Sequence, residues 1–192
     1  VTMPDPLLVV EAVSLKFGGV AALRDVSFEV RPRELFAVIG PNGAGKTSIF
    51  NCLNAVYRPQ RGSARLDGRE LLDLSPAETA ERGVARTFQN LALVPGMSVL
   101  DNVRLGAYAS SRGGFVASTL RLPPVRREEA RVRDAAMAVL DALGLAALAP
   151  RPCGGLPYGT LKRIELGRAV VGSPRLLLLD EHTAALDPKV AH

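Results

Sequence analysis

Tryptophan is absent from this chain of 192 residues, and aromatic residues make up only 5% of it. Lysine and arginine exceed acidic residues by five charges, but no dense basic tract gathers them and few aromatics lie between them. Surfaces that bind nucleic acid usually combine both features. We therefore interpret the charge of +5 as an arginine-rich, solvated surface, and keep nucleic acid or an anionic membrane surface as the less favoured alternative.

Cysteines and long apolar runs are also scarce. Cys52 and Cys153 form no CxxC pair and have no histidine cluster beside them, which indicates spectator thiols in a reducing compartment. No window approaches the ~20 apolar residues of a membrane span, and Asp141 and Gly144 interrupt the nearest candidate, 135–149. No basic segment followed by an apolar stretch marks a signal peptide. We expect a soluble chain whose membrane role, if it has one, comes through a partner.

The remaining composition, 47% hydrophobic and 22% charged, is that of a globular domain. Apolar or alternating runs predict strands at 7–10, 26–30, 35–39, 84–88 and 174–180, and a hairpin at 62–71. Gly18-Gly19 and Asp67-Gly68 are turn signals. Helical patterns occur at 47–56, 75–83, 98–108, 128–143 and 160–171, and 110–124 looks irregular. Ser75 and Glu78 have the spacing of a capping box. This alternation predicts an α/β fold with a mostly parallel sheet, an antiparallel appendage and a helical insert at about 95–155.

A glycine-rich loop carries the first chemistry. It reads Gly40, Pro41, Asn42, Gly43, Ala44, Gly45, Lys46, Thr47. Its glycines allow backbone N–H groups to face phosphate oxygens, and the following helix adds the positive end of its dipole. Lys46 would reach the β- and γ-phosphates, and the Thr47 hydroxyl would ligate Mg²⁺. A chance glycine turn is the alternative, but a predicted strand before the loop and a helix after it favour the phosphate loop.

Two carboxylates follow the apolar run 176–179, at the carboxyl end of a predicted strand. Parallel sheets place ligands at this edge. Asp180 is predicted to contact Mg²⁺ through water, and Glu181 to polarise the attacking water. Two acids that only face solvent are the alternative. With the phosphate loop, the pair indicates a nucleotide triphosphatase.

Between these motifs the sequence resembles the ATP-binding cassette family over essentially the whole chain. Residues 86–89, Arg-Thr-Phe-Gln, resemble its Q-loop, so Gln89 is implied to contact Mg²⁺ and the catalytic water. Phe17 stands where the family places an aromatic residue against adenine, and Ser48 extends the implied nucleotide-binding residues. The segment at the family's signature position is Leu156, Pro157, Tyr158, Gly159, Thr160, and the segment resembling the D-loop is Ala184, Ala185, Leu186, Asp187. No Asn-Lys-x-Asp motif for guanine occurs, which favours ATP.

The resemblance implies a P-loop NTPase fold with three parts: an antiparallel β subdomain (1–34, 59–73), a nucleotide-binding core (35–58, 74–90, 161–192) and a helical subdomain (91–160). It implies two cassettes that sandwich two ATP molecules head to tail, so that the signature segment of one chain contacts the γ-phosphate held by the other. Gly159 would lie just before a helix that begins near Leu161. An ordinary helix cap is the alternative for this turn.

The finer resemblance is to the ATPases of branched-chain amino acid importers, carried by 39–47, 50–53, 86–89, the insert from Gly114 to Arg127, and Tyr158. It implies a second cassette ATPase, integral membrane permease subunits, an indirect link to a solute-binding receptor, and a peripheral place on the cytoplasmic face of the plasma membrane. No nucleic acid is implied as partner. A soluble cassette ATPase acting on DNA or ribosomes usually has long coiled-coil insertions or a second cassette in the chain, and neither occurs here.

Three departures from the family pattern stand out. Pro157 replaces a serine and offers neither a hydroxyl nor an N–H. His182 replaces a proline, and we interpret it as a tolerated loop residue. The family pattern continues past His192 with a strand between those ending at Gly40 and Asp180, and with a switch histidine. We therefore expect a truncated core with a central gap. ATP hydrolysis coupled to import is the leading hypothesis, and a nucleotide-binding fragment with little or no turnover is the alternative.

Overall fold

The computed structural model describes residues 5–87, 92–108 and 123–180. Its contacts divide the chain into two compact units, Val1–Thr79 and Ala80–His192, each described here by itself. No helix in the described ranges is long and apolar enough to cross a membrane.

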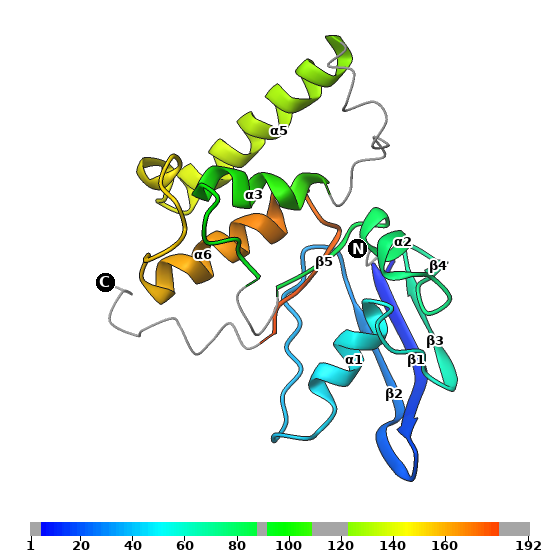
Figure 1. The fold of residues 1–192 in the computed structure, drawn as a ribbon. Coiled ribbons are helices and arrows are strands. Elements are labelled where there is room, and N and C mark those ends of the chain that lie inside the picture. The colour runs from blue at the N-terminus through cyan, green and yellow to red at the C-terminus, as the bar shows by residue number, and fades with distance from the viewer. Residues whose placement is uncertain (1–4, 88–91, 109–122, 181–192) are drawn as a thin grey trace. The chain divides into compact units, whose positions relative to one another are not determined.

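The first unit is built on an antiparallel sheet with strand order β2-β1-β3-β4. Its strands are β1 (Leu8–Phe17), β2 (Val20–Val30), β3 (Arg61–Leu66) and β4 (Arg69–Glu70), drawn from blue to green in Figure 1. The alternating side chains of β1 bury Leu8, Val10, Val13 and Leu15 on one face. The predicted antiparallel appendage is confirmed, although β1 and β2 are longer than the predicted runs.

Two tight turns connect these strands where the sequence predicts them. Gly18 adopts a φ of 54° between β1 and β2, and Asp67 and Gly68 have φ values of 49° and 71° between β3 and β4. Two successive positive φ angles are typical of a two-residue hairpin turn whose twist matches that of the strands. The predicted hairpin at 62–71 is therefore confirmed.

Helix α1 (Lys46–Leu53) follows the glycine-rich loop and packs against the sheet with one face. Ile49, Cys52 and Leu53 are buried on that face. The helix is shorter than the predicted range of 47–56. It ends at Asn54, and Ala55 then takes a φ of 57°, which a helix cannot continue.

The predicted buried strand at 35–39 is wrong. These residues form no strand and are exposed, with Leu35 and Ile39 each at 92%. A parallel strand needs a neighbour for its backbone groups, and no strand in the described ranges pairs with this run. Phe36 instead stacks on Phe28 of β2, with ring centroids 5.0 Å apart.

Helix α2 (Pro76–Glu81) begins with the predicted capping box. The Ser75 N–H donates to Glu78 Oε2 at 2.7 Å, and the Glu78 N–H donates back to Ser75 Oγ at 3.3 Å. Gly83, with a φ of 86°, follows the helix. Local sequence is enough to define this start because the two side chains satisfy each other's N–H groups.

The second unit pairs β5 (Val84–Arg86) with β6 (Leu176–Leu178) as parallel strands. The register sets Val84 beside Leu176 and Arg86 beside Leu178, and the Thr87 N–H continues the ladder to the Leu178 carbonyl at 3.0 Å. The predicted strands at 84–88 and 174–180 both end at residues proposed for chemistry. Such residues gather at one edge of a sheet when the strands are parallel, as these two are.

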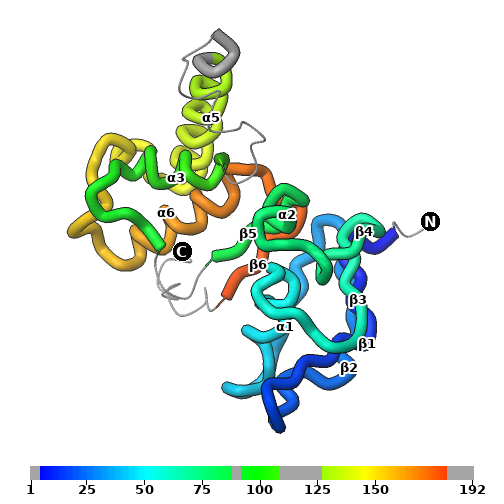
Figure 2. Tube along the Cα trace, turned by 45° about the vertical axis from the view of Figure 1, so that its right-hand side comes forward, coloured from blue at the N-terminus to red at the C-terminus, as the bar shows by residue number. Residues whose placement is uncertain are grey.

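Helices α3 (Val99–Tyr108), α5 (Pro123–Ala142) and α6 (Tyr158–Val170) pack together in the second unit, with the short 3₁₀ helix η1 (Ala146–Leu148) beside them (Figures 1 and 2). Val99, Val103, Leu140 and Ile164 are at the centre of their shared core. The helical insert is thus confirmed. Helix α5 begins five residues earlier than predicted, at Pro123, because proline is compatible with the first helical position.

Candidate functional site

The glycine-rich loop of the first unit closes directly into α1. Gly43 and Gly45 have φ values of 83° and 89°, a conformation that strains other residues. A Cβ on Gly45 would approach the Ala22 carbonyl oxygen of β2 to 2.5 Å. Glycine is therefore required at this position both by the turn and by the close contact with the sheet.

The loop leaves the N-terminus of α1 available to an anion. Gly45 is the N-cap, and no side chain accepts a hydrogen bond from the first turn of the helix. The Ile49 N–H makes the first helical bond, to the Gly45 carbonyl at 3.0 Å, so the N–H groups of Lys46, Thr47 and Ser48 precede any i−4 acceptor. Three such donors and the helix dipole favour an anion such as a phosphate.

Lys46 lies across the mouth of this loop. Its ammonium donates to the Gly40 carbonyl at 2.6 Å and to the Pro41 carbonyl at 2.8 Å. These bonds hold a positive charge inside the loop, and no carboxylate in the described ranges forms an ion pair with it. The loop therefore presents a fixed cation beside free N–H donors, an arrangement suited to a polyanion.

Phe17 ends β1 and is half exposed, as a residue that stacks on a ligand must be. Its ring meets the ring of Tyr57 edge to face, with centroids 5.0 Å apart. Tyr57 was not among the predicted site residues. It fixes the orientation of the Phe17 ring, since T-shaped aromatic pairs prefer this geometry.

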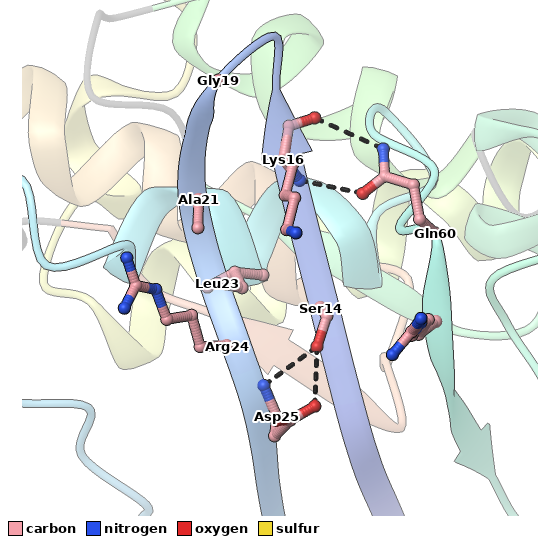
Figure 3. A pocket seen from close by; sticks show the side chains of 9 residues that line it. Ser14, Lys16, Gly19, Ala21, Leu23, Arg24, Asp25 and Gln60 are labelled. Carbon is pink, nitrogen blue, oxygen red and sulfur yellow. Dashed lines mark hydrogen bonds between the residues drawn. The ribbon is translucent and has the colours of Figure 1, made fainter.

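A hollow of about 620 Å³ lies on the same sheet and was not predicted (Figure 3). Ser14 and Asp25 join β1 to β2 by two hydrogen bonds of 2.9 and 3.0 Å, and the Gln60 side chain bonds both backbone groups of Lys16. Lys16, with two arginines of the lining, Arg24 and Arg61, gives the hollow a positive character. None of the residues of the glycine-rich loop lines it.

In the second unit, Asp180 follows β6 and is buried. The Arg86 guanidinium donates from Nη2 to Asp180 Oδ2 at 2.8 Å. Sequence reasoning singled out Asp180 but treated Arg86 only as part of a motif. The missed signal is the alternation of the strands, which directs residues 178 and 180 to the same face.

The segment at 156–160 leads into α6. Pro157 is the N-cap, and its carbonyl accepts from the Thr160 and Leu161 N–H groups at 2.9 and 3.0 Å. Proline has no side-chain oxygen, so no side chain caps the first turn.

The predicted helix start near Leu161 is wrong. Helix α6 begins at Tyr158, which places Gly159 inside its first turn rather than before it. Pro157 itself has the extended conformation of a cap, with φ −57° and ψ 145°, and its carbonyl accepts the first hydrogen bonds of the helix. The Gly159 N–H is still one of the unpaired donors of the first turn, and a Cβ on Gly159 would meet nothing within 4 Å.

The Tyr158 side chain is exposed, and Lys162 of the same helix lies beside its ring. The Lys162 ammonium lies 5.9 Å from the centre of its ring and donates to Glu165 Oε2 at 3.0 Å. Lys162 and Glu165 are both buried, so this pair is part of the helix core rather than of the surface. It links the signature segment to the packed face of α6.

The predicted site residues are divided between the two units. Phe17 and the loop residues 40–48 belong to the first unit, and Asp180 and the segment 156–160 to the second. Several predicted residues lie outside the described ranges. They are Gln89, Glu181, His182, His192 and the D-loop residues Ala184, Ala185, Leu186 and Asp187. Within the described ranges, no group of three or more His, Cys, Asp or Glu side chains gathers as a metal cluster.

Comparison with known proteins finds relatives of this chain. A family model described as "ABC transporter" matches residues 23–184. The chain is 40% identical over 187 residues to the high-affinity branched-chain amino acid transport ATP-binding protein LivG of Salmonella typhimurium, covering 97% of this chain and 73% of the relative. It is 38% identical, with the same coverage, to the high-affinity branched-chain amino acid transport ATP-binding protein BraF of Pseudomonas aeruginosa.

Solved structures agree with the fold. The ADP conformation of an ATP-binding cassette from an ABC transporter superposes with a TM-score of 0.81 at 30% identity, covering 98% of this chain and 74% of that one. A dimeric post-hydrolysis cassette bound to ADP and Pi matches with a TM-score of 0.75 at 26% identity, covering 95% of this chain and 77% of that one.

Proposed function

Because this chain belongs to the ABC transporter family, we propose that it is the ATP-hydrolysing subunit of an importer for branched-chain amino acids. The observation that carries the proposal is the loop from Gly40 to Thr47, with its two left-handed glycines, fixed ammonium and unpaired N–H donors. The identity of 38–40% with importer ATPases over nearly the whole chain supports the choice of transport and of solute.

The nucleotide's phosphates are proposed to bind the loop residues 40–48, with the adenine against Phe17. When a phosphate enters, the Lys46 ammonium exchanges its bonds to the Gly40 and Pro41 carbonyls for phosphate oxygens, and the N–H groups of the first turn of α1 complete the cradle. Tyr57 holds the Phe17 ring in its orientation.

Residues of this chain also fit a divalent cation. Magnesium takes oxygen ligands, and Thr47 offers a hydroxyl and Asp180 a carboxylate. The Asp180 carboxylate is buried and is held in place by the Arg86 guanidinium at 2.8 Å. Thr47, Asp180 and Gln89 are proposed to hold Mg²⁺, which when bound neutralises phosphate charge during hydrolysis. Glu181 is proposed as the general base that orients the attacking water.

A second copy or a related cassette is proposed to complete the site. The first turn of α6 has unpaired N–H groups and Pro157 in place of a side-chain cap, so the segment Leu156–Thr160 can meet the γ-phosphate held by the partner. The D-loop segment 184–187 is proposed to lie at the same interface. A dimeric cassette bound to ADP and Pi is among the matching structures.

The wider assembly follows from the same proposal. Two ATPase subunits would drive integral permease subunits at the cytoplasmic face of the membrane, and a solute-binding receptor would deliver the amino acid. The three-part division of the chain into β subdomain, nucleotide-binding core and helical subdomain is proposed as well, with the residues 91–160 and Gln89 nearest the permease.

The test is ATP turnover with Glu181→Gln. This change keeps the shape of the side chain but removes the base, so we expect turnover to fall at least about a hundredfold while bound ATP accumulates with dimers. Phosphate release measures turnover, filter binding measures the ATP that is retained, and light scattering measures the mass of the dimer. Glu81→Gln, on the exposed end of α2, is the matched control and should leave all three unchanged. Unchanged turnover in Glu181→Gln contradicts the role of Glu181.

Nucleotide binding without turnover is the second candidate. No strand in the described ranges pairs with residues 35–39, immediately before the proposed phosphate loop. This favours the second candidate, because a loop whose supporting segment lacks a hydrogen-bonded neighbour is less rigid. Phosphate release by the unsubstituted chain separates the candidates, with Lys46→Ala as the control for ATP binding. Under both readings Lys46→Ala weakens ATP binding, but only under the leading proposal does the unsubstituted chain release phosphate.

A further inference from the structure

The ion pair between Arg86 and Asp180 is the feature that the proposed function does not yet explain. The two side chains are only 8% and 9% exposed, and the Nη2 to Oδ2 distance is 2.8 Å. The residues are 94 positions apart in sequence, and both lie in the second unit.

The pairing of β5 with β6 brings them together. Arg86 stands beside Leu178 in the parallel register. Side chains alternate along a strand, so Leu178 and Asp180 are directed to the same face, and Arg86 reaches the residue diagonally ahead of its partner. The contact is therefore built into the register and does not depend on a flexible surface side chain.

A carboxylate at this depth needs a cation beside it. Taking a charge out of water is unfavourable unless an opposite charge and hydrogen bonds replace the water. Arg86 provides both, through its guanidinium. Any second cation that approaches Asp180 meets the repulsion of this guanidinium.

We propose that Arg86 is a positioning residue that competes with a divalent cation for the Asp180 carboxylate. It holds the carboxylate in place when no metal is bound, and it weakens cation binding so that the metal arrives only with the phosphates that help to hold it. This inference rests on the proposed function, because it takes Asp180 as a contact of the metal.

The test measures Mn²⁺ binding rather than turnover. Free Mn²⁺ is counted by electron paramagnetic resonance in the presence of a saturating non-hydrolysable ATP analogue, with the analogue alone as the blank. We expect Arg86→Met to bind Mn²⁺ at least about tenfold more tightly than the unsubstituted chain, because a positive charge beside the ligand is gone. Arg86→Lys keeps the charge but loses the planar fork, and should lie between the two.

Stability supplies a second readout. Arg86→Met should unfold at lower urea than the unsubstituted chain in metal-free buffer, and Mn²⁺ with the analogue should restore much of the difference. Arg65→Met is the matched control, since Arg65 pairs with Glu11 at 3.1 Å where the side chains are 46% and 56% exposed. It should change neither Mn²⁺ affinity nor its effect on unfolding. The double substitution Arg86→Met with Asp180→Asn should remove the dependence on Mn²⁺.

The possible results separate this inference from the function it rests on. Equal or weaker Mn²⁺ binding by Arg86→Met overturns the competition. If that variant folds in neither buffer, the neutral Arg86→Gln decides, and an affinity equal to that of the unsubstituted chain overturns it. If Asp180→Asn alone leaves Mn²⁺ binding unchanged, the proposed metal contact itself fails.

Discussion

At the scale of single residues, Asn102 shows how much one buried amide can organise. Its Nδ2 donates to the carbonyls of Val94 and Ser98 at 3.0 Å each and to Cys153 Sγ at 3.2 Å. Its Oδ1 accepts from the Val94 N–H at 2.8 Å. The side chain is fully buried, so water cannot replace any of these partners.

We expect Asn102→Leu to lower the free energy of unfolding by roughly 2 kcal/mol or more, because several buried polar groups lose their partner together. Urea unfolding followed by circular dichroism measures the loss. Asn102→Asp keeps the acceptor for Val94 but sets a carboxylate against carbonyl oxygens, and should be at least as harmful. Stability equal to that of the unsubstituted chain would contradict the structural role of this amide.

Cys52, on the buried face of α1, gives a prediction about pH. Burial raises the pKa of its thiol from the ordinary 9.0 to about 11. Between these values the folded chain keeps a proton that the unfolded chain releases, so this contribution to stability is complete below pH 9 and lost as the pH rises toward 11.

At pH 8 we therefore expect Cys52 to react with Ellman's reagent only as fast as the protein opens, because the thiolate is the nucleophile. Absorbance at the wavelength of the released product follows the reaction, in buffer and in denaturing urea. Cys52→Ala identifies its share of the signal, since burial also raises the pKa of Cys153. Rapid reaction of Cys52 in the folded chain would contradict its burial.

At the scale of elements, the contact between α3 and α6 depends on Gly106. A Cβ at this position would collide with the Arg168 carbonyl oxygen and come within 2.9 Å of Val171 Cγ1. Backbone and packed side chain cannot both retreat from a rigid helix pair. The glycine is therefore required by close packing and not by an unusual backbone angle.

Gly106→Ala should lower the free energy of unfolding by about 1–3 kcal/mol through overpacking. Gly159→Ala is the matched control within α6, because a Cβ there meets nothing within 4 Å. Alanine favours a helix over glycine by up to ~1 kcal/mol, so the control should be neutral or stabilising. Equal effects of the two substitutions in urea unfolding would show that helix propensity, and not the helix contact, controls the outcome.

At the scale of the whole molecule, the exposed apolar run at 35–39 is the segment that we expect to promote self-association. Leu35 and Ile39 are 92% exposed, and Phe36 and Val38 are also among the exposed hydrophobic residues. An unpaired apolar segment can join the backbone of another chain and promote association.

Replacing Ile39 with lysine should reduce self-association without loss of stability, because the side chain makes no buried contact to lose. Light scattering and binding of the dye ANS measure the change across a concentration series. Val20→Lys is the control, because Val20 is an exposed apolar residue outside this run, on β2, and it should change association little. Equal association in both variants would show that the run is not the contact surface.

Local patterns predicted the features that local interactions decide. The Ser75 capping box, the Asp67-Gly68 turn and the glycine-rich loop all rest on residues within a few positions of one another. The strand at 35–39 failed because apolar sequence is necessary for a parallel strand but hydrogen bonds to a neighbour are what form it. The predicted start of α6 near Leu161 lies three residues after the observed start at Tyr158, because the Pro157 carbonyl accepts the first hydrogen bonds of the helix.

The sequence by itself determined the family, and it predicted the phosphate loop and the acidic strand end, because these depend on residue type at fixed spacing. Only the tertiary structure decided that Arg86 holds Asp180, that Asn102 ties a loop to Cys153, and that Gly106 lies against Arg168. Each of these contacts joins residues at least 51 positions apart in sequence, and each depends on strand register or helix packing. Such pairings are set by the burial of whole elements, which no single segment of sequence contains.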